Sequence, residues 1–199
     1  MRDPAVAEAL DAIRREHARD PRVAAGGGEG TVSEAYHAAV ERWLGHLVSD
    51  PSPALALAAA AAHLRRHEVP RGRFPPGRAG YLAYRAAAAE HQARCLAAVL
   101  AQVGVDPAVA EYACNLVARR APAGDASAQA LEDAVCLAFF ERDAVGFARR
   151  HPPGKVRRVV AKTLAKMSPP ARRIAARNAA LPDAVRALVR RAAAPGFIP

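Results

Sequence analysis

The amino-acid sequence predicts an all-α fold: one compact helical domain over residues 1–199 with about eight or nine helices. Ala, Leu and Arg, which favour helices, dominate the composition, while β-branched residues are few and scattered. No stretch alternates apolar and polar residues as a half-buried strand would. Hydrophobic residues make up 52% of the 199 residues, which is enough for one core and excludes a mainly disordered chain.

Breaks at Pro, Gly and Asp divide the chain into helical segments. The predicted helices are, in order, residues 4–18, 34–48, 54–67, 78–103, 107–120, 127–148, 155–167, 169–178 and 182–194. Asp3 and Asp106 each precede a Pro, which is typical of an N-cap followed by the first helical turn. Ser33 is the predicted N-cap of the second helix, and Gly104 is expected to end the fourth.

Two segments are predicted to lie outside helices. Glycines near residues 25–31 indicate a flexible link, and they lack the strand–loop–helix setting and Lys-Ser or Lys-Thr ending of a phosphate loop. Residues 69–78 combine Pro, Gly and Arg and predict a loop. Pro restricts its backbone, so its arginines can be held in place without regular structure.

The charge and the cysteine content indicate which partners and which cellular compartment to expect. The net charge of +10 favours anionic partners such as nucleic acid or a phosphorylated ligand, although an Arg-rich composition alone also explains it. The longest apolar run, residues 54–62, is far below the ~20 residues that span a bilayer, so no membrane partner is expected. We do not expect the first residues to form a secretory signal, and Cys95, Cys114 and Cys136 are predicted to be buried free thiols in a cytoplasmic protein.

Candidate binding residues concentrate between residues 63 and 85, in HLRRHEVPRGRFPPGRAGYLAYR. His63 and His67 stand one helical turn apart, a spacing at which two imidazoles can share a metal, with Glu68 beside them. Arginines follow these residues. Arg78 and Arg85 are seven positions apart, close to two helical turns, so they share a helix face. We expect Arg71, Arg78 and Arg85 to border the same cleft as His63 and to bind an anion. The alternative is that they pair with acidic residues or lie in solvent.

These motifs carry a family resemblance. The segment above, then EHQARCLAAVLAQVGVD and QALEDAVCLAFFE, with VERWL near the start and KTLAKMS and LPDAVRALV near the end, resembles the family catalogued as domain of unknown function 4202. The likeness covers nearly the whole chain. It implies no established activity.

More distantly, the order of features resembles the HD-domain superfamily of metal-dependent phosphohydrolases. The resemblance implies that His37, His63, His91 and Asp133 surround a divalent metal (Zn, Mn or Fe), whose bound water attacks the substrate. Leu64 occupies the place of the paired Asp of that pattern, and Glu68 and Glu132 are candidates to replace it. Arg119 and Arg120 stand where a further His is often found.

Each candidate ligand also has a structural interpretation. His37 could be an exposed helix residue, and His63 could bond a helix terminus. His91 could pair with Glu90, and Asp133 could pair with a loop arginine. The leading functional prediction is a metal-dependent hydrolase, or a degenerate relative, acting on a phosphorylated or other anionic small molecule. The alternative is a non-catalytic basic module that binds RNA or an acidic protein, and the sequence does not predict an oligomeric state.

Overall fold

The computed structural model describes residues 3–24, 30–177 and 181–192, and most of these residues are helical, which confirms the predicted all-α fold. The α-helices in this part of the chain are α1 Pro4–Ala18, α2 Val32–Leu47, α3 Pro53–Ala60, α4 Gly77–Val103, α5 Pro107–Ala118, α6 Ala126–Arg142, α7 Ala144–Arg150, α8 Pro153–Lys166, α9 Pro169–Arg177 and α10 Asp183–Ala192. Two short 3-10 helices, η1 Arg66–Glu68 and η2 Arg71–Arg73, lie between α3 and α4. The described residues form no strand, only an isolated antiparallel bridge between Val23 and Thr31.

The helix starts follow the local capping signals. The side chains of Asp3 and Asp106 accept hydrogen bonds from the first backbone N–H groups of α1 and α5, as predicted. The prediction of Ser33 as the cap of α2 is wrong. Thr31 and Glu34 form a capping box there, and Ser33 lies inside the helix with its hydroxyl against His17.

Two predicted helices end earlier than expected. The helix predicted over residues 54–67 stops at Ala60, because His63 and Arg65 adopt left-handed backbone conformations with φ of 63° and 48°. The helix predicted over residues 127–148 is divided at Asp143 into α6 and α7. This turn places the ring of Phe147 edge-on to that of Phe139, with ring centroids 6.4 Å apart.

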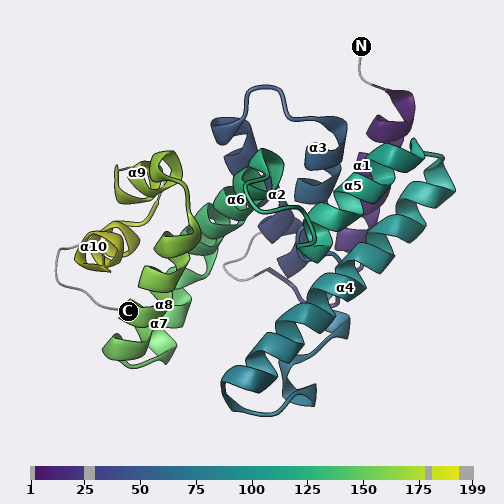
Figure 1. Cartoon of the computed structure of the whole chain (residues 1–199). Helices are drawn as coiled ribbons and strands as arrows, with labels where there is room; N and C mark the ends of the chain where they lie inside the picture. Colours follow the sequence, from purple (N-terminus) through teal and green to yellow (C-terminus); the bar gives the residue numbers. More distant parts are fainter. Residues whose placement is uncertain (1–2, 25–29, 178–180, 193–199) are drawn as a thin grey trace.

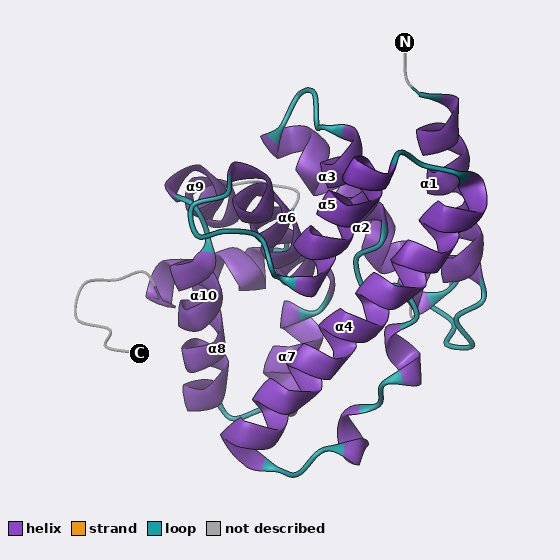
Figure 2. Ribbon diagram, turned by 45° about the vertical axis from the view of Figure 1, so that its right-hand side comes forward, coloured by secondary structure: helices purple, strands orange, loops and turns teal. Residues whose placement is uncertain are grey.

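The helices surround a central group formed by α2, α3 and α6 (Figure 1). The long helix α4 runs along one side with α5 and α1, and α8, α9 and α10 gather on the opposite side, beyond α6 (Figures 1 and 2). Trp43, Leu57, Leu96, Leu137 and Phe140 are among the largest fully buried side chains and come from α2, α3, α4 and α6. Burial of such residues supplies the main stabilisation of the fold.

Helix α3 is buried almost all round because it consists of Ala and Leu after its first residue. Small side chains let α1, α2, α5 and α6 approach it closely, so the helix forms the centre of the core. Its last carbonyl, that of Ala60, accepts a hydrogen bond from Nε2 of the buried His17 at 2.8 Å. The end of α3, from which the chain leaves for His63, is therefore fixed from inside the molecule.

The loop predicted over residues 69–78 is held against α4. The Arg71 guanidinium donates to the carbonyl oxygens of Phe74 and Pro75, at 2.8 and 2.9 Å. A Cβ on Gly80 would lie 1.9 Å from the Pro75 carbonyl oxygen, so only Gly permits this close approach. Within the predicted glycine link, residues 25–29 lie outside the described residues.

The structure also bears on two predictions made from composition, which concern the cysteines and membrane-spanning helices. Cys95, Cys114 and Cys136 are free thiols, and Cys136 is buried as predicted. The prediction of burial is wrong for Cys95 and Cys114, which are half-buried. No helix in the described ranges combines the length and the apolar character needed to cross a membrane.

Candidate anion-binding pocket

A pocket of about 200 Å³ opens where the end of α3, the middle of α4, the end of α5 and the start of α6 meet. That volume is more than ten times the ~10–15 Å³ that one water molecule needs. Its polar lining consists of His63, Arg66, Arg85, Gln92, Arg119 and Glu132. Its apolar wall includes Ala58, Ala62, Leu116, Leu131 and Val135. The pocket can therefore contact an apolar group and a charged group of one molecule.

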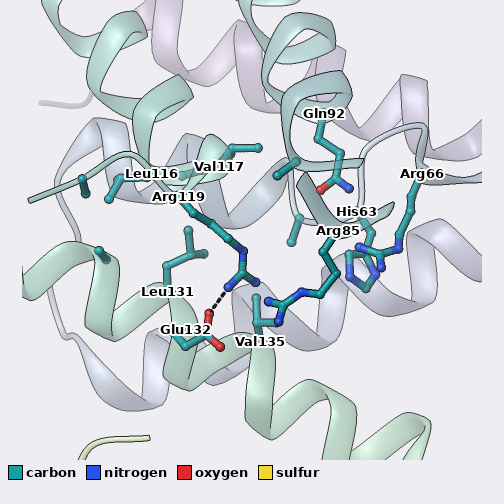
Figure 3. Close-up of a pocket in the computed structure, with 15 residues that line it drawn as sticks. His63, Arg66, Arg85, Gln92, Leu116, Val117, Arg119, Leu131, Glu132 and Val135 are labelled. Carbon is teal, nitrogen blue, oxygen red and sulfur yellow. Dashed lines mark hydrogen bonds and ion pairs between the residues drawn. The ribbon is translucent and has the colours of Figure 1, made fainter. Parts of the chain in front are cut away.

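Positive charge exceeds negative charge in this lining. Figure 3 shows Arg85, Arg119 and Glu132 pointing toward one another, with Arg66 beside His63. Nη1 of Arg119 lies 2.8 Å from Oε2 of Glu132, and Nζ of Lys166 lies 3.2 Å from its Oε1. Burial raises the pKa of Glu132, but Arg119 and Lys166 outweigh it and leave the pKa below its ordinary value. Glu132 is thus ionised at neutral pH, and among the described residues it is the one carboxylate in a pocket lining that carries three guanidinium groups.

Arg85 has no carboxylate partner within the described ranges. Its guanidinium lies 5.9 Å from the centroid of the Tyr81 ring, and no hydrogen bond or ion pair engages it. Arg66 donates through Nε to the Tyr84 hydroxyl at 3.1 Å and also has no carboxylate partner. An incoming anion would therefore not have to displace a carboxylate in order to bind these two cations.

His63 presents a neutral imidazole to the pocket. Its ring stacks on Tyr36, with centroids 4.0 Å apart, and neither ring nitrogen has a hydrogen-bond partner among the described residues. Burial, followed by the charges of Arg66 and Arg119, lowers the pKa of His63 well below 6.5. At neutral pH one ring nitrogen can therefore donate a hydrogen bond and the other can accept one.

Two residues that line the pocket hold an unusual backbone conformation. His63 and Arg119 have φ of 63° and 62°, in the left-handed region that favours Gly. Arg65 is the third such non-glycine residue in the described part of the chain. Residues held in this region cluster at functional sites, because the surrounding structure must stabilise them.

Gln92 adds an unsatisfied donor. Its side chain is buried, and its Nε2 has no hydrogen-bond partner in the described structure. Figure 3 shows its amide on the side of the pocket that carries His63. A buried amide without a partner costs free energy, so a ligand acceptor that reached Nε2 would recover that cost.

The structure does not bring the four predicted metal ligands together. His37 is buried, stacks on His17 with centroids 4.6 Å apart, and has Nδ1 3.2 Å from Oε2 of Glu41. His91 has Nε2 3.0 Å from Oε2 of Glu68 rather than a pairing with Glu90, and His63 lines the pocket alone. Because His37 is buried, the alternative interpretation of it as an exposed helix residue is wrong.

The fourth candidate, Asp133, has a structural role. Its Oδ1 accepts hydrogen bonds from the Ser168 backbone N–H at 2.8 Å and from the Gln129 amide at 3.0 Å, so it contacts no loop arginine. In the described ranges no group of three or more His, Cys, Asp and Glu side chains is arranged to hold a metal ion. A bound Zn, Mn or Fe therefore stays a prediction from the resemblance, without a coordination sphere to support it.

The predicted accessory residues divide between two places. Glu132 lines the pocket, whereas Glu68 accepts from Nε of Arg65 at 2.7 Å and pairs with His91. His67 has Nδ1 3.7 Å from Oδ1 of Asp20. His67 and Glu68 thus belong to a separate charged cluster that joins the η1 turn to α4 and to the segment after α1.

Of the predicted anion-binding arginines, only Arg85 lines the pocket with His63. Arg71 is engaged by its own loop carbonyls. Arg78 shares a helix face with Arg85, but seven residues separate them by ~10 Å along the helix axis, so it lies beyond the pocket. A shared face was not sufficient to place both residues in one site.

Sequence reasoning missed Arg66, Gln92 and the part played by Arg119. Arg85, Ala89 and Gln92 follow the i, i+4, i+7 spacing of one helix face, so this pattern could have indicated polar groups on a face that also packs. The Arg119 backbone could not be read from the sequence, because Gly is the residue expected at a left-handed helix end.

The fold and the site together define an all-helical protein with a partly enclosed, arginine-lined pocket. The chain belongs to the DUF4202 family (Domain of unknown function), whose model matches residues 7–189. This confirms the family resemblance. No curated protein and no solved structure matches the chain, so the more distant likeness to HD domains stays a prediction.

Proposed function

We propose that this protein binds a small phosphorylated or otherwise anionic molecule in the arginine-lined pocket, with an apolar part of the ligand against Leu116 and Leu131. The observation that carries the proposal is the charge imbalance: three guanidinium groups and a single carboxylate face one pocket. Arg85 has no carboxylate partner to compete with a ligand. Guanidinium groups bind phosphate and carboxylate through paired N–H donors.

The remaining polar groups support the same ligand chemistry. The imidazole of His63 has two free nitrogens, and Gln92 offers an unpaired amide donor. These groups suit the oxygen atoms of an ester or of a sugar-like substituent next to the anionic group. The apolar wall favours an organic anion over inorganic phosphate, because it gains from contact with carbon.

The proposal covers binding and leaves metal-assisted hydrolysis aside. Hydrolysis through a metal-bound water needs three or four ligands around one ion. The predicted ligands His37, His91 and Asp133 have other partners, so the geometry favours the predicted ligand class over the predicted reaction.

Isothermal titration calorimetry with phenyl phosphate tests the proposal. This probe carries a dianionic group and an apolar ring, and we expect it to bind more tightly than inorganic phosphate, while phenol does not bind measurably. Arg85→Gln should weaken phenyl phosphate by roughly 10- to 150-fold, the equivalent of one lost charged hydrogen bond.

Arg78→Gln is the matched control. It removes the same charge from the same helix at an exposed position outside the pocket. Affinity should be unchanged in this variant. Equal losses in both variants would show that net charge alone attracts the probe, and an absence of binding to the unmodified protein would refute the proposal.

A further inference from the structure

The positive charge of the chain is concentrated in its last quarter. Residues 1–143 carry sixteen Lys and Arg against eighteen Asp and Glu, whereas residues 144–199 carry thirteen Lys and Arg against one acid, Asp183. That acid already pairs with Arg186. The net charge of +10 is therefore a property of α7 to α10 and not of the whole molecule.

Helix α8 organises part of this charge into a line. Lys155, Arg158, Lys162 and Lys166 are spaced by three, four and four residues, so they lie along one face of the helix over ~16 Å. All four are exposed, and the residues that α8 buries, Val156, Val160, Thr163 and Leu164, lie on another face. We name these four cations the α8 stripe. Figures 1 and 2 show α8 on the side of the molecule away from α1.

Most of the α8 stripe is free of acidic partners. Lys166 pairs with Glu132 at 3.2 Å, and Nζ of Lys155 lies 3.3 Å from Nδ1 of His151. Arg158 and Lys162 have no ion pair or hydrogen bond from their side chains in the described ranges. Because α8 contains no acidic residue, neighbouring cations repel one another along the helix, which costs free energy unless an anion neutralises them.

An Arg-rich composition does not explain the α8 stripe. The three lysines of the chain are Lys155, Lys162 and Lys166, and all three belong to the stripe. A bias toward Arg predicts neither the use of Lys nor its restriction to one face of one helix.

We propose that the α8 stripe binds the phosphate backbone of a nucleic acid. A row of three or four cations is complementary to a chain of regularly spaced phosphates, and such contacts need no base recognition. The stripe meets the arginine-lined pocket at Lys166, which pairs with Glu132, whereas Lys155, Arg158 and Lys162 do not line the pocket and can be changed without altering it. Either DNA or RNA offers the required phosphates, and the test includes both.

The test measures binding of the full chain to a 20-base-pair DNA duplex and to a 20-nucleotide RNA across salt concentrations. Three phosphate contacts predict a log K against log salt slope of about −3 for the duplex, or a loss of roughly 60-fold between 50 and 200 mM salt. The variant Lys155→Gln, Arg158→Gln, Lys162→Gln should flatten that slope to near zero. Its affinity for phenyl phosphate should be unchanged.

A second triple variant is the matched control: Arg73→Gln, Arg78→Gln, Arg94→Gln. These three arginines are exposed and without ion pairs within the described ranges, and their removal lowers the net charge by the same amount. We expect this variant to bind nucleic acid as the unmodified protein does. Arg157→Gln, which lies off the stripe, should likewise have less effect than Arg158→Gln.

Binding of either nucleic acid with a selective loss in the stripe variant supports the proposal. Equal losses in the two triple variants would overturn it, since binding would then follow total charge. If the protein binds neither the duplex nor the RNA at 50 mM salt, the proposal is overturned. This holds even if anionic lipid vesicles retain the protein.

Discussion

At the scale of single residues, the backbone conformations of His63 and Arg119 connect stability with binding. A left-handed conformation costs a non-glycine residue about 1–2 kcal/mol, because its Cβ approaches the following carbonyl oxygen. Both residues direct polar side chains into the pocket. A chain selected for stability alone would place Gly at these positions, as it does at Gly104 after α4.

Arg119→Gly and Arg119→Ala separate the two effects. Both variants remove the guanidinium and its ion pair with Glu132, and both should weaken phenyl phosphate. Only Gly relieves the left-handed backbone, so thermal or urea unfolding should show the Gly variant to be more stable than the Ala variant by about 1 kcal/mol. Equal stabilities would contradict the inference that the backbone at residue 119 is strained.

The buried His17 predicts how stability depends on pH. Its Nε2 donates to the Ala60 carbonyl, and its Nδ1 lies 2.6 Å from the Ser33 hydroxyl, from which it accepts while the ring is neutral. Burial lowers the pKa of His17 from 6.5 to about 4. The unfolded chain therefore takes up a proton before the folded one, and the stability present above pH 6.5 is lost as the pH falls toward 4.

Urea unfolding at pH 7 and pH 5 measures this effect. The free energy of unfolding should fall by about 2 kcal/mol from His17 alone between these values. His17→Gln, which does not titrate, should show a smaller fall. The same pH dependence in both proteins would mean that His17 is already protonated in the fold or is accessible to solvent.

At the scale of helices, starts were more predictable than ends. A start depends on one capping side chain and on Pro in the first turn, as at Asp3 and Asp106, and both signals are local. The end of α3 is followed by left-handed backbone at His63 and Arg65, and its last carbonyl is satisfied by His17, forty-three residues away in the sequence. Such a contact leaves no local pattern, which is why the predicted helix continued to residue 67.

The loop before α4 gives a prediction at this scale. Gly80→Ala would place a Cβ against the Pro75 carbonyl oxygen, and the loop must then move away from α4. We expect a loss of roughly 1–3 kcal/mol, comparable with overpacking of a core. Gly72→Ala is the control in the same loop, since a Cβ there meets nothing within 4 Å, and it should leave the melting temperature nearly unchanged. The reverse order of the two effects would refute the loop contact.

At the scale of the whole molecule, the sequence predicted the fold class and the family, but only part of the site. His63, Arg85 and Glu132 were among the predicted residues, and the structure brings them together in one pocket. Their neighbours Arg66 and Arg119 come from turns whose conformation depends on tertiary contacts. The prediction that Arg78 and Arg85 border the same pocket is wrong for Arg78. A helix face extends over many turns, whereas a pocket spans two or three.

The whole molecule also carries two cationic surfaces of different shape. The arginine-lined pocket is concave and has apolar walls, which suits a small organic anion. The α8 stripe is linear and exposed, which suits a polyanion. Glu132 contacts Arg119 on the pocket side and Lys166 at the end of the stripe, so its charge is shared between the two.

A crystal structure of the protein grown with phenyl phosphate would show directly whether an organic anion occupies the pocket. We predict the phosphate within hydrogen-bond distance of Arg85 and of Arg66 or Arg119, with the ring against Leu116 and Leu131. Density for the probe at another surface, or a pocket filled only by water at concentrations that saturate binding in solution, would show that the pocket is not the binding site.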